Sequence, residues 1–176
     1  ACKTANPKLT HQFVAINPFE CRICTFMENY DCLSLKYNSI AMENYTLDND
    51  IHLVCVRART FPDGIQDAFK TLLETDRSFI SRTRYGISHG SDNGIVYWAA
   101  VEEGFKGEGY TFGLDQYTIR KGVYATEKLR NITGNETRIA NAFEKLLKHP
   151  KLDPQGECIE WYKPGDEVLC MVRLTE

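Results

Sequence analysis

The chain has 176 residues, 43% of them hydrophobic and 26% charged, which is typical of a globular protein with a substantial core. The net charge of −3 provides no general basic field, so we expect no direct binding of nucleic acid by this chain. No apolar run reaches the roughly 18 residues needed to span a bilayer, so we expect no membrane partner.

Residues 1–40 form an N-terminal segment of unknown role, which contains a Cys-x-x-Cys pair at Cys21 and Cys24. Two further cysteines in this segment could complete a zinc site, but structural zinc sites usually show a second closely spaced ligand pair. The alternative is an alternating strand through residues 19–26 that happens to contain two thiols. The four histidines of the chain show no metal-ligand spacing either. We therefore expect no metal and no cofactor.

The chain contains seven cysteines, an odd number without the spacing of a disulfide framework. Reduced thiols in a cytoplasmic protein are the simplest explanation, because disulfides are rare in the cytosol.

Residues 51–60 have the β-branched content and partial alternation of a strand. Residues 65–73 then carry apolar side chains at i, i+3, i+4, i+7 and i+8, the pattern of one helix face. Residues 81–88 and 94–103 are strand-like runs joined by a turn-rich loop, as in a β-hairpin. The order of this first unit is therefore strand, helix, strand, strand.

The same order recurs after a glycine-rich crossover at residues 104–114. Residues 116–129 are strand-like, a second helix follows, and residues 157–162 and 168–174 flank a strong Pro-Gly turn signal. The helix pattern also repeats 74 positions on: Ile65, Ala68, Phe69, Leu72 and Leu73 recur as Ile139, Ala142, Phe143, Leu146 and Leu147. Such self-similarity indicates an internal duplication.

We predict an α+β fold in which duplicated β-α-β-β units form antiparallel sheet, with two helices on one face and a central cleft. The predicted ligand domain covers residues 41–176. Its two pseudo-symmetric repeats are expected at about 41–104 and 115–176.

Two stretches carry a resemblance to a known family. They are Tyr97-Trp98-Ala99-Ala100-Val101-Glu102, and the closing Asp153-Pro-Gln-Gly-Glu-Cys-Ile-Glu160-Trp161-Tyr162. Together with Tyr124 at the end of residues 117–125, they resemble the gyrase-inhibitor-like (GyrI-like) effector-binding domains of AraC-type and MerR-type bacterial regulators. The local match is imperfect, because Arg120 and Lys121 stand where the family often has proline or alanine before the glycine.

The resemblance implies a cleft in which aromatic side chains and a buried glutamate bind hydrophobic, often cationic, compounds. The residues that it assigns to ligand binding are Glu160, Tyr162, Trp98, Glu102, Tyr124 and Trp161. Glu160 and Tyr162 are two apart on a strand and so share a face. Because a buried carboxylate is costly, Glu160 either faces solvent or faces a cavity that awaits a cation.

The function predicted first is binding of a small hydrophobic or cationic organic compound, as a sensor domain of a bacterial regulator or as a sequestering protein. From the resemblance, a DNA-binding domain elsewhere in the full gene is also an expectation. One alternative is a hydrolase that acts on a reactive ligand in the same cleft, with a glutamate and a tyrosine as acting groups. Another is a protein that inhibits a DNA-processing enzyme. We favour binding without chemistry and assign no catalytic residue.

Overall fold

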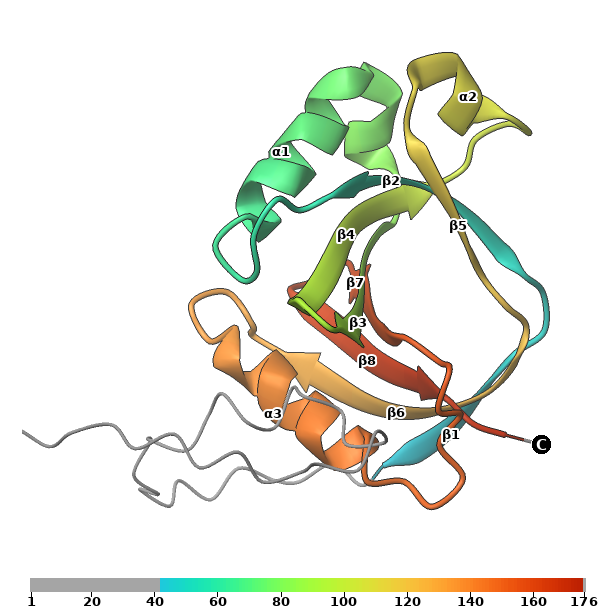
Figure 1. Cartoon of the computed structure of the whole chain (residues 1–176), viewed down its shortest axis with the longest axis vertical. Helices are drawn as coiled ribbons and strands as arrows, with labels where there is room; N and C mark the ends of the chain where they lie inside the picture. Colours follow the sequence, from blue (N-terminus) through green and yellow to red (C-terminus); the bar gives the residue numbers. More distant parts are fainter. Residues whose placement is uncertain (1–41, 176) are drawn as a thin grey trace, which may run out of the picture.

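A computed structural model describes residues 42–175, which form an eight-stranded antiparallel sheet with helices packed against it (Figure 1). The first half contains β1 (Glu43–Leu47), β2 (Ile51–Arg57), α1 (Ile65–Thr75), the 3₁₀ turn η2 (Arg77–Ser81), β3 (Arg84–Ser91) and β4 (Gly94–Glu102). The second contains α2 (Glu108–Phe112), β5 (Asp115–Ile119), β6 (Gly122–Arg130), α3 (Thr137–Leu146), β7 (Cys158–Lys163) and β8 (Glu167–Arg173). The predicted Cys21 and Cys24 pair lies outside the described residues.

The predicted α+β fold is confirmed, with the order strand, helix, strand, strand occurring twice and the long helices α1 and α3 on one face. Four local details differ from the sequence prediction. β1 was not predicted as a strand, and the strand-like residues 116–129 are divided into β5 and β6. The first strand of the β3–β4 hairpin begins at Arg84 because η2 occupies the preceding residues, where Asp76 accepts a hydrogen bond from the backbone of Ser78. The glycine-rich crossover contains α2, which lies between Gly107 and Gly113 in left-handed conformations.

The strands follow the order β1-β6-β8-β7-β3-β4-β2-β5. Strands β7 and β3, one from each half of the chain, form the central pair. The outer strands are exchanged between the halves, because β1 pairs with β6 and β5 pairs with β2. The backbone N–H of Lys121, between β5 and β6, donates to Asp50, between β1 and β2. The sheet therefore joins the two halves at its centre and at both edges.

The core has three parts. One lies between α1 and the sheet, where Ala68 and Leu72 are fully covered but Ile65 and Phe69 are only half-buried. Another lies under α3, whose four apolar positions Ile139, Ala142, Phe143 and Leu146 are all buried. The third covers the face of the sheet away from both helices, which we call the open face. The two helices therefore have the same apolar pattern in sequence, but the apolar side chains of α3 are more deeply buried than those of α1.

Within residues 42–175, we found no helix that is both apolar enough and long enough to traverse a lipid bilayer.

Candidate functional site

Strand alternation divides the predicted ligand residues between the two faces of the sheet. Trp98, Tyr124 and Trp161 belong to or pack against the open-face core. Glu102 also lies on the open face, because the hydroxyl of Tyr85 donates to it across 2.6 Å. All four side chains thus lie on the face of the sheet opposite α1 and α3.

Glu160 and Tyr162 lie on the opposite, helix-covered face. Tyr162 packs against the core under α3 and makes an edge-on contact with Phe69 of α1, with ring centroids 5.7 Å apart. This arrangement differs from the sequence prediction, which grouped both residues with Trp98 and Tyr124 around one ligand. The spacing of two correctly indicates a shared face, but it cannot indicate which face the helices cover.

Glu160 is buried, and two phenol hydroxyls donate to one of its carboxylate oxygens, Oε2. The carboxylate accepts hydrogen bonds from the hydroxyls of Tyr97, at 2.9 Å, and Tyr162, at 2.5 Å. Burial raises the pKa of Glu160, and the two tyrosine hydrogen bonds oppose that rise only in part. Because no cation lies among these contacts, the cost of burying the carboxylate is offset only in part, by the two phenols.

The open face contains two cavities that share Gln116 and Tyr117 of β5. The larger has a volume of about 530 Å³ and the smaller about 270 Å³. Tyr124 and Ile159 contribute to the wall of the larger cavity, and Trp98 contributes to the wall of the smaller. Tyr117 therefore stands at the junction of the two spaces, and we call them together the β5 cleft.

A carboxylate accompanies an aromatic ring in the smaller cavity. The indole N–H of Trp98 donates to Asp115 across 3.3 Å, while the imidazole of His89 stacks on the indole at 5.4 Å. Burial and, to a smaller extent, the negative charge of Asp115 raise the pKa of the Cys55 thiol to about 12. A thiol with so high a pKa is a poor nucleophile, so Cys55 acts as an apolar part of this wall.

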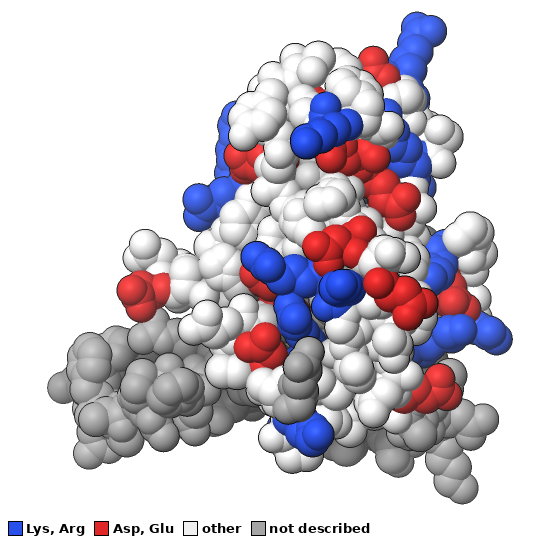
Figure 2. Space-filling view, turned by 90° about the vertical axis from the view of Figure 1, so that its right-hand side faces the viewer, with Lys and Arg blue, Asp and Glu red and all other residues white. Residues whose placement is uncertain are grey.

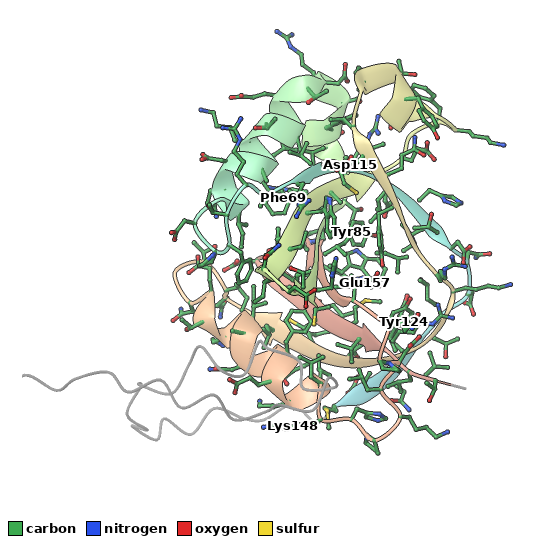
Figure 3. All side chains as sticks on the ribbon, viewed as in Figure 1. Phe69, Tyr85, Asp115, Tyr124, Lys148 and Glu157 are labelled. Carbon is green, nitrogen blue, oxygen red and sulfur yellow. The ribbon has the colours of Figure 1, made fainter. Side chains whose placement is uncertain are left out.

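The larger cavity repeats this combination with different residues. Burial raises the pKa of Tyr117, and its hydrogen bond to Glu157 and the charge of that carboxylate add to the effect. Tyr124 is buried and donates its hydroxyl hydrogen bond to the backbone carbonyl of Arg120 at 2.5 Å. Arg173 also lines this space, with its guanidinium 3.9 Å from Asp153. Tyr124 and Glu157 are labelled in Figure 3, together with Tyr85 and Asp115.

Charges on the side of the molecule opposite α1 and α3 are mixed. Figure 2 shows basic and acidic side chains interspersed over this side, with white surface between them. This side of the molecule therefore has no single dominant sign of charge.

A separate aromatic group lies elsewhere on the open face. Tyr85 stacks against Trp161 with centroids 5.6 Å apart, and Tyr45 meets the same indole edge-on at 6.0 Å. The ammonium of Lys163 lies over the indole, 3.2 Å from its centroid. We call Tyr45, Tyr85, Trp161 and Glu102 the Trp161 group.

Three cleft residues, Asp115, Tyr117 and Glu157, were not among the predicted ligand residues. Asp115 and Tyr117 are two apart on β5, so alternation alone could have placed them on a common face. Glu157 could not have been found in this way, because it comes from the chain just before β7 and meets Tyr117 only in the tertiary structure. Within residues 42–175, no group of three or more His, Cys, Asp or Glu side chains is arranged to hold a metal ion.

Comparison with protein-family models and with curated proteins gave no match. Solved structures do resemble the fold. SAV2435, bound to tetraphenylphosphonium, is 12% identical with a TM-score of 0.53, and the alignment covers 76% of this chain and 94% of that one. A hydrolase from Listeria innocua is 8% identical with a TM-score of 0.54, covering 76% and 91%. A candidate transcription regulation protein from Staphylococcus aureus MU50 is 12% identical with a TM-score of 0.52, covering 76% and 98%. At these identities the likeness concerns the fold alone.

Proposed function

We propose that the protein is a small-molecule-binding module that takes organic cations with apolar or aromatic substituents in the β5 cleft. The observation that carries the proposal is the position of Tyr117 between two cavities, each with a carboxylate beside an aromatic ring. Aromatic faces attract cations through the ring quadrupole, and a partly desolvated carboxylate supplies the counter-charge.

The proposed biological role is that of a GyrI-like effector-binding domain, which senses or sequesters its ligand in the bacterial cytoplasm. The motif resemblance at residues 97–102 and 153–162 supports this role, and so does the likeness of fold to SAV2435, a protein that holds a lipophilic cation. The buried thiols of Cys55, Cys158 and Cys170 form no disulfide, which fits a reducing compartment.

The proposal is tested by calorimetric titration with tetraphenylphosphonium and with neutral triphenylphosphine oxide. Asp115→Asn and Glu157→Gln keep the shape of each side chain and remove its charge. We expect each change to weaken phosphonium binding by about tenfold, between the effects of an exposed and a desolvated ion pair, with little change for the neutral compound. Glu74→Gln, an exposed position on α1, is the matched control.

Glu160→Gln provides a second discrimination, because this carboxylate lies on the helix-covered face. It should leave the cation affinity unchanged if the β5 cleft is the site. Equal losses for the cation and the neutral compound in the cleft variants, or binding of neither compound to wild type, would overturn the proposal.

Hydrolysis of a reactive ligand is the second candidate function. The Glu102–Tyr85 hydrogen bond of 2.6 Å favours it, because a carboxylate and a phenol in contact are the groups that such a reaction needs. Incubation with an activated ester would test it. Turnover that Glu102→Gln abolishes would establish the enzyme, and an unchanged rate would exclude Glu102 as its base.

A further inference from the structure

Lys163 occupies a position that an organic cation would fill. Its ammonium lies 3.2 Å from the centroid of the Trp161 ring. At this distance the charge is in direct contact with the indole face, well inside the roughly 6 Å range of a cation–π interaction. Tyr85 and Tyr45 surround the same indole, so the ammonium sits against an aromatic group rather than on an isolated ring.

The charges around Lys163 complete the arrangement. Burial lowers the pKa of Lys163, whereas the carboxylates of Glu167 and Glu102 raise it and the ammonium of Lys128 lowers it. Glu167 already has two basic partners, Lys128 at 3.5 Å and Arg130 at 3.1 Å. Glu102 accepts a hydrogen bond from Tyr85 and contributes its negative charge near Lys163. The Trp161 group thus combines a carboxylate with aromatic faces, and the cation present there belongs to the protein itself.

The position of Lys163 allows it to leave. It is the last residue of β7, directly before the turn at residues 164–166, and its side chain is only half-buried. The four-carbon side chain of lysine is flexible, so the ammonium can move into water without a change in the backbone of β7. Its departure would uncover the face of Trp161 and leave the charge of Glu102 available to another cation.

We propose that Tyr45, Tyr85, Trp161 and Glu102 form a second cation site, which Lys163 fills when no ligand is bound and which a quaternary ammonium compound enters by displacing Lys163. None of these five residues lines either cavity of the β5 cleft, so the site goes beyond the proposed function and does not depend on it. The bound lysine lowers the apparent affinity by the fraction of molecules in which the site is filled. Only ligands that bind the Trp161 group more tightly than the ammonium of Lys163 therefore occupy the site.

The test uses Trp161 fluorescence in a Trp98→Phe background, in which Trp161 is the only tryptophan of the chain. The probes are benzyltrimethylammonium and neutral benzyl alcohol. Lys163→Ala empties the position, Lys163→Gln removes the charge at similar length, and Lys163→Arg keeps the charge. We expect Ala and Gln to strengthen ammonium binding by about tenfold, as removal of an internal competitor requires, and Arg to leave it near the parent value.

Glu102→Gln in the Lys163→Ala protein should abolish most of that gain. An unchanged ammonium affinity in both Lys163→Ala and Lys163→Gln would overturn the proposal, and so would an equal gain for benzyl alcohol. Thermal unfolding by circular dichroism confirms that each variant is folded at the titration temperature. Since the Ala and Gln variants both remove the charge, either one decides the question if the other does not fold. Asp115→Asn should not alter the Trp161 fluorescence titration, so binding at the Trp161 group can be distinguished from binding in the β5 cleft.

Discussion

The hydroxyl of Tyr97 on β4 donates a hydrogen bond of 2.9 Å to Glu160 on β7, and the two side chains meet over Gly86 of the intervening strand β3. A glycine at this position leaves the space that the phenol and the carboxylate fill. The contact joins strands from both halves of the chain on the helix-covered face. It explains why a carboxylate can be buried at the centre of this sheet.

Gly86→Ala should destabilise the fold. A Cβ there would collide with the Tyr97 hydroxyl and come within 2.5 Å of a Glu160 oxygen. We expect a loss of about 1–3 kcal/mol in the free energy of unfolding, as for other overpacked cores, measured by urea denaturation. Gly90→Ala is the matched control on the same strand, because a Cβ at Gly90 meets nothing within 4 Å. Equal stability of the two variants would contradict this account.

Glu160→Gln should change how stability depends on pH. Burial raises the pKa of Glu160 above the ordinary value of 4.5, so the folded protein holds this proton at pH values where the unfolded chain has released it. The stability contribution of Glu160 therefore decreases as the pH rises from 4.5 through the raised folded pKa. Urea unfolding at several pH values should show wild type losing stability relative to Glu160→Gln over this window. A course for Glu160→Gln that runs parallel to wild type over this window would disprove the raised pKa.

The helix phenylalanines should differ in their contribution to stability, although the sequence repeats them identically. Phe143 is 4% exposed in the core under α3, whereas Phe69 is half-buried. We expect Phe143→Ala to cost about 3–5 kcal/mol and Phe69→Ala less, since less surface and a smaller cavity are involved. Denaturant unfolding of the two variants provides the measurement. A larger loss for Phe69→Ala would show that its contact with Tyr162 stabilises more than its burial indicates.

Glu108→Gln should weaken the connection between α2 and the rest of the fold. Glu108 is 1% exposed, and both of its carboxylate oxygens accept hydrogen bonds from Arg82, at 2.5 and 2.8 Å. Gly104 donates a further backbone hydrogen bond at 2.8 Å. Removing the charge leaves Arg82 with hydrogen bonds to Glu102 O and Ser78 but without its anionic partner, so we expect a loss of about 3 kcal/mol in unfolding free energy.

The comparison for Glu108 is Glu167→Gln, which removes the partner of the more exposed Lys128 and Arg130. That change should cost less than about 1 kcal/mol, because solvent screens exposed ion pairs. A Glu108 loss no larger than the Glu167 loss would contradict the role of the buried pair.

The two helix patterns and the hairpins were readable from the chain because each depends on local periodicity. Residues 65–73 place their apolar side chains at helical spacing, and the Pro-Gly turn at residues 164–165 separates two strand-like runs. The repeat of the helix pattern 74 residues later indicated that the order of elements in the first half recurs in the second. Together these patterns were sufficient to predict the α+β fold and the helices on one face.

The composition of the site required the tertiary structure. Alternation makes Glu160 and Tyr162 share a face, but it is equally compatible with either side of the sheet, and the packing of α1 and α3 decides which side is covered. The meeting of Tyr117 with Glu157 depends on the exchange of β5 onto β2, a pairing between residues distant in sequence. Sequence alone thus determined the two long helices and the two hairpins, whereas long-range packing decided which side chains face a cavity, because only packing breaks the equivalence of the two faces.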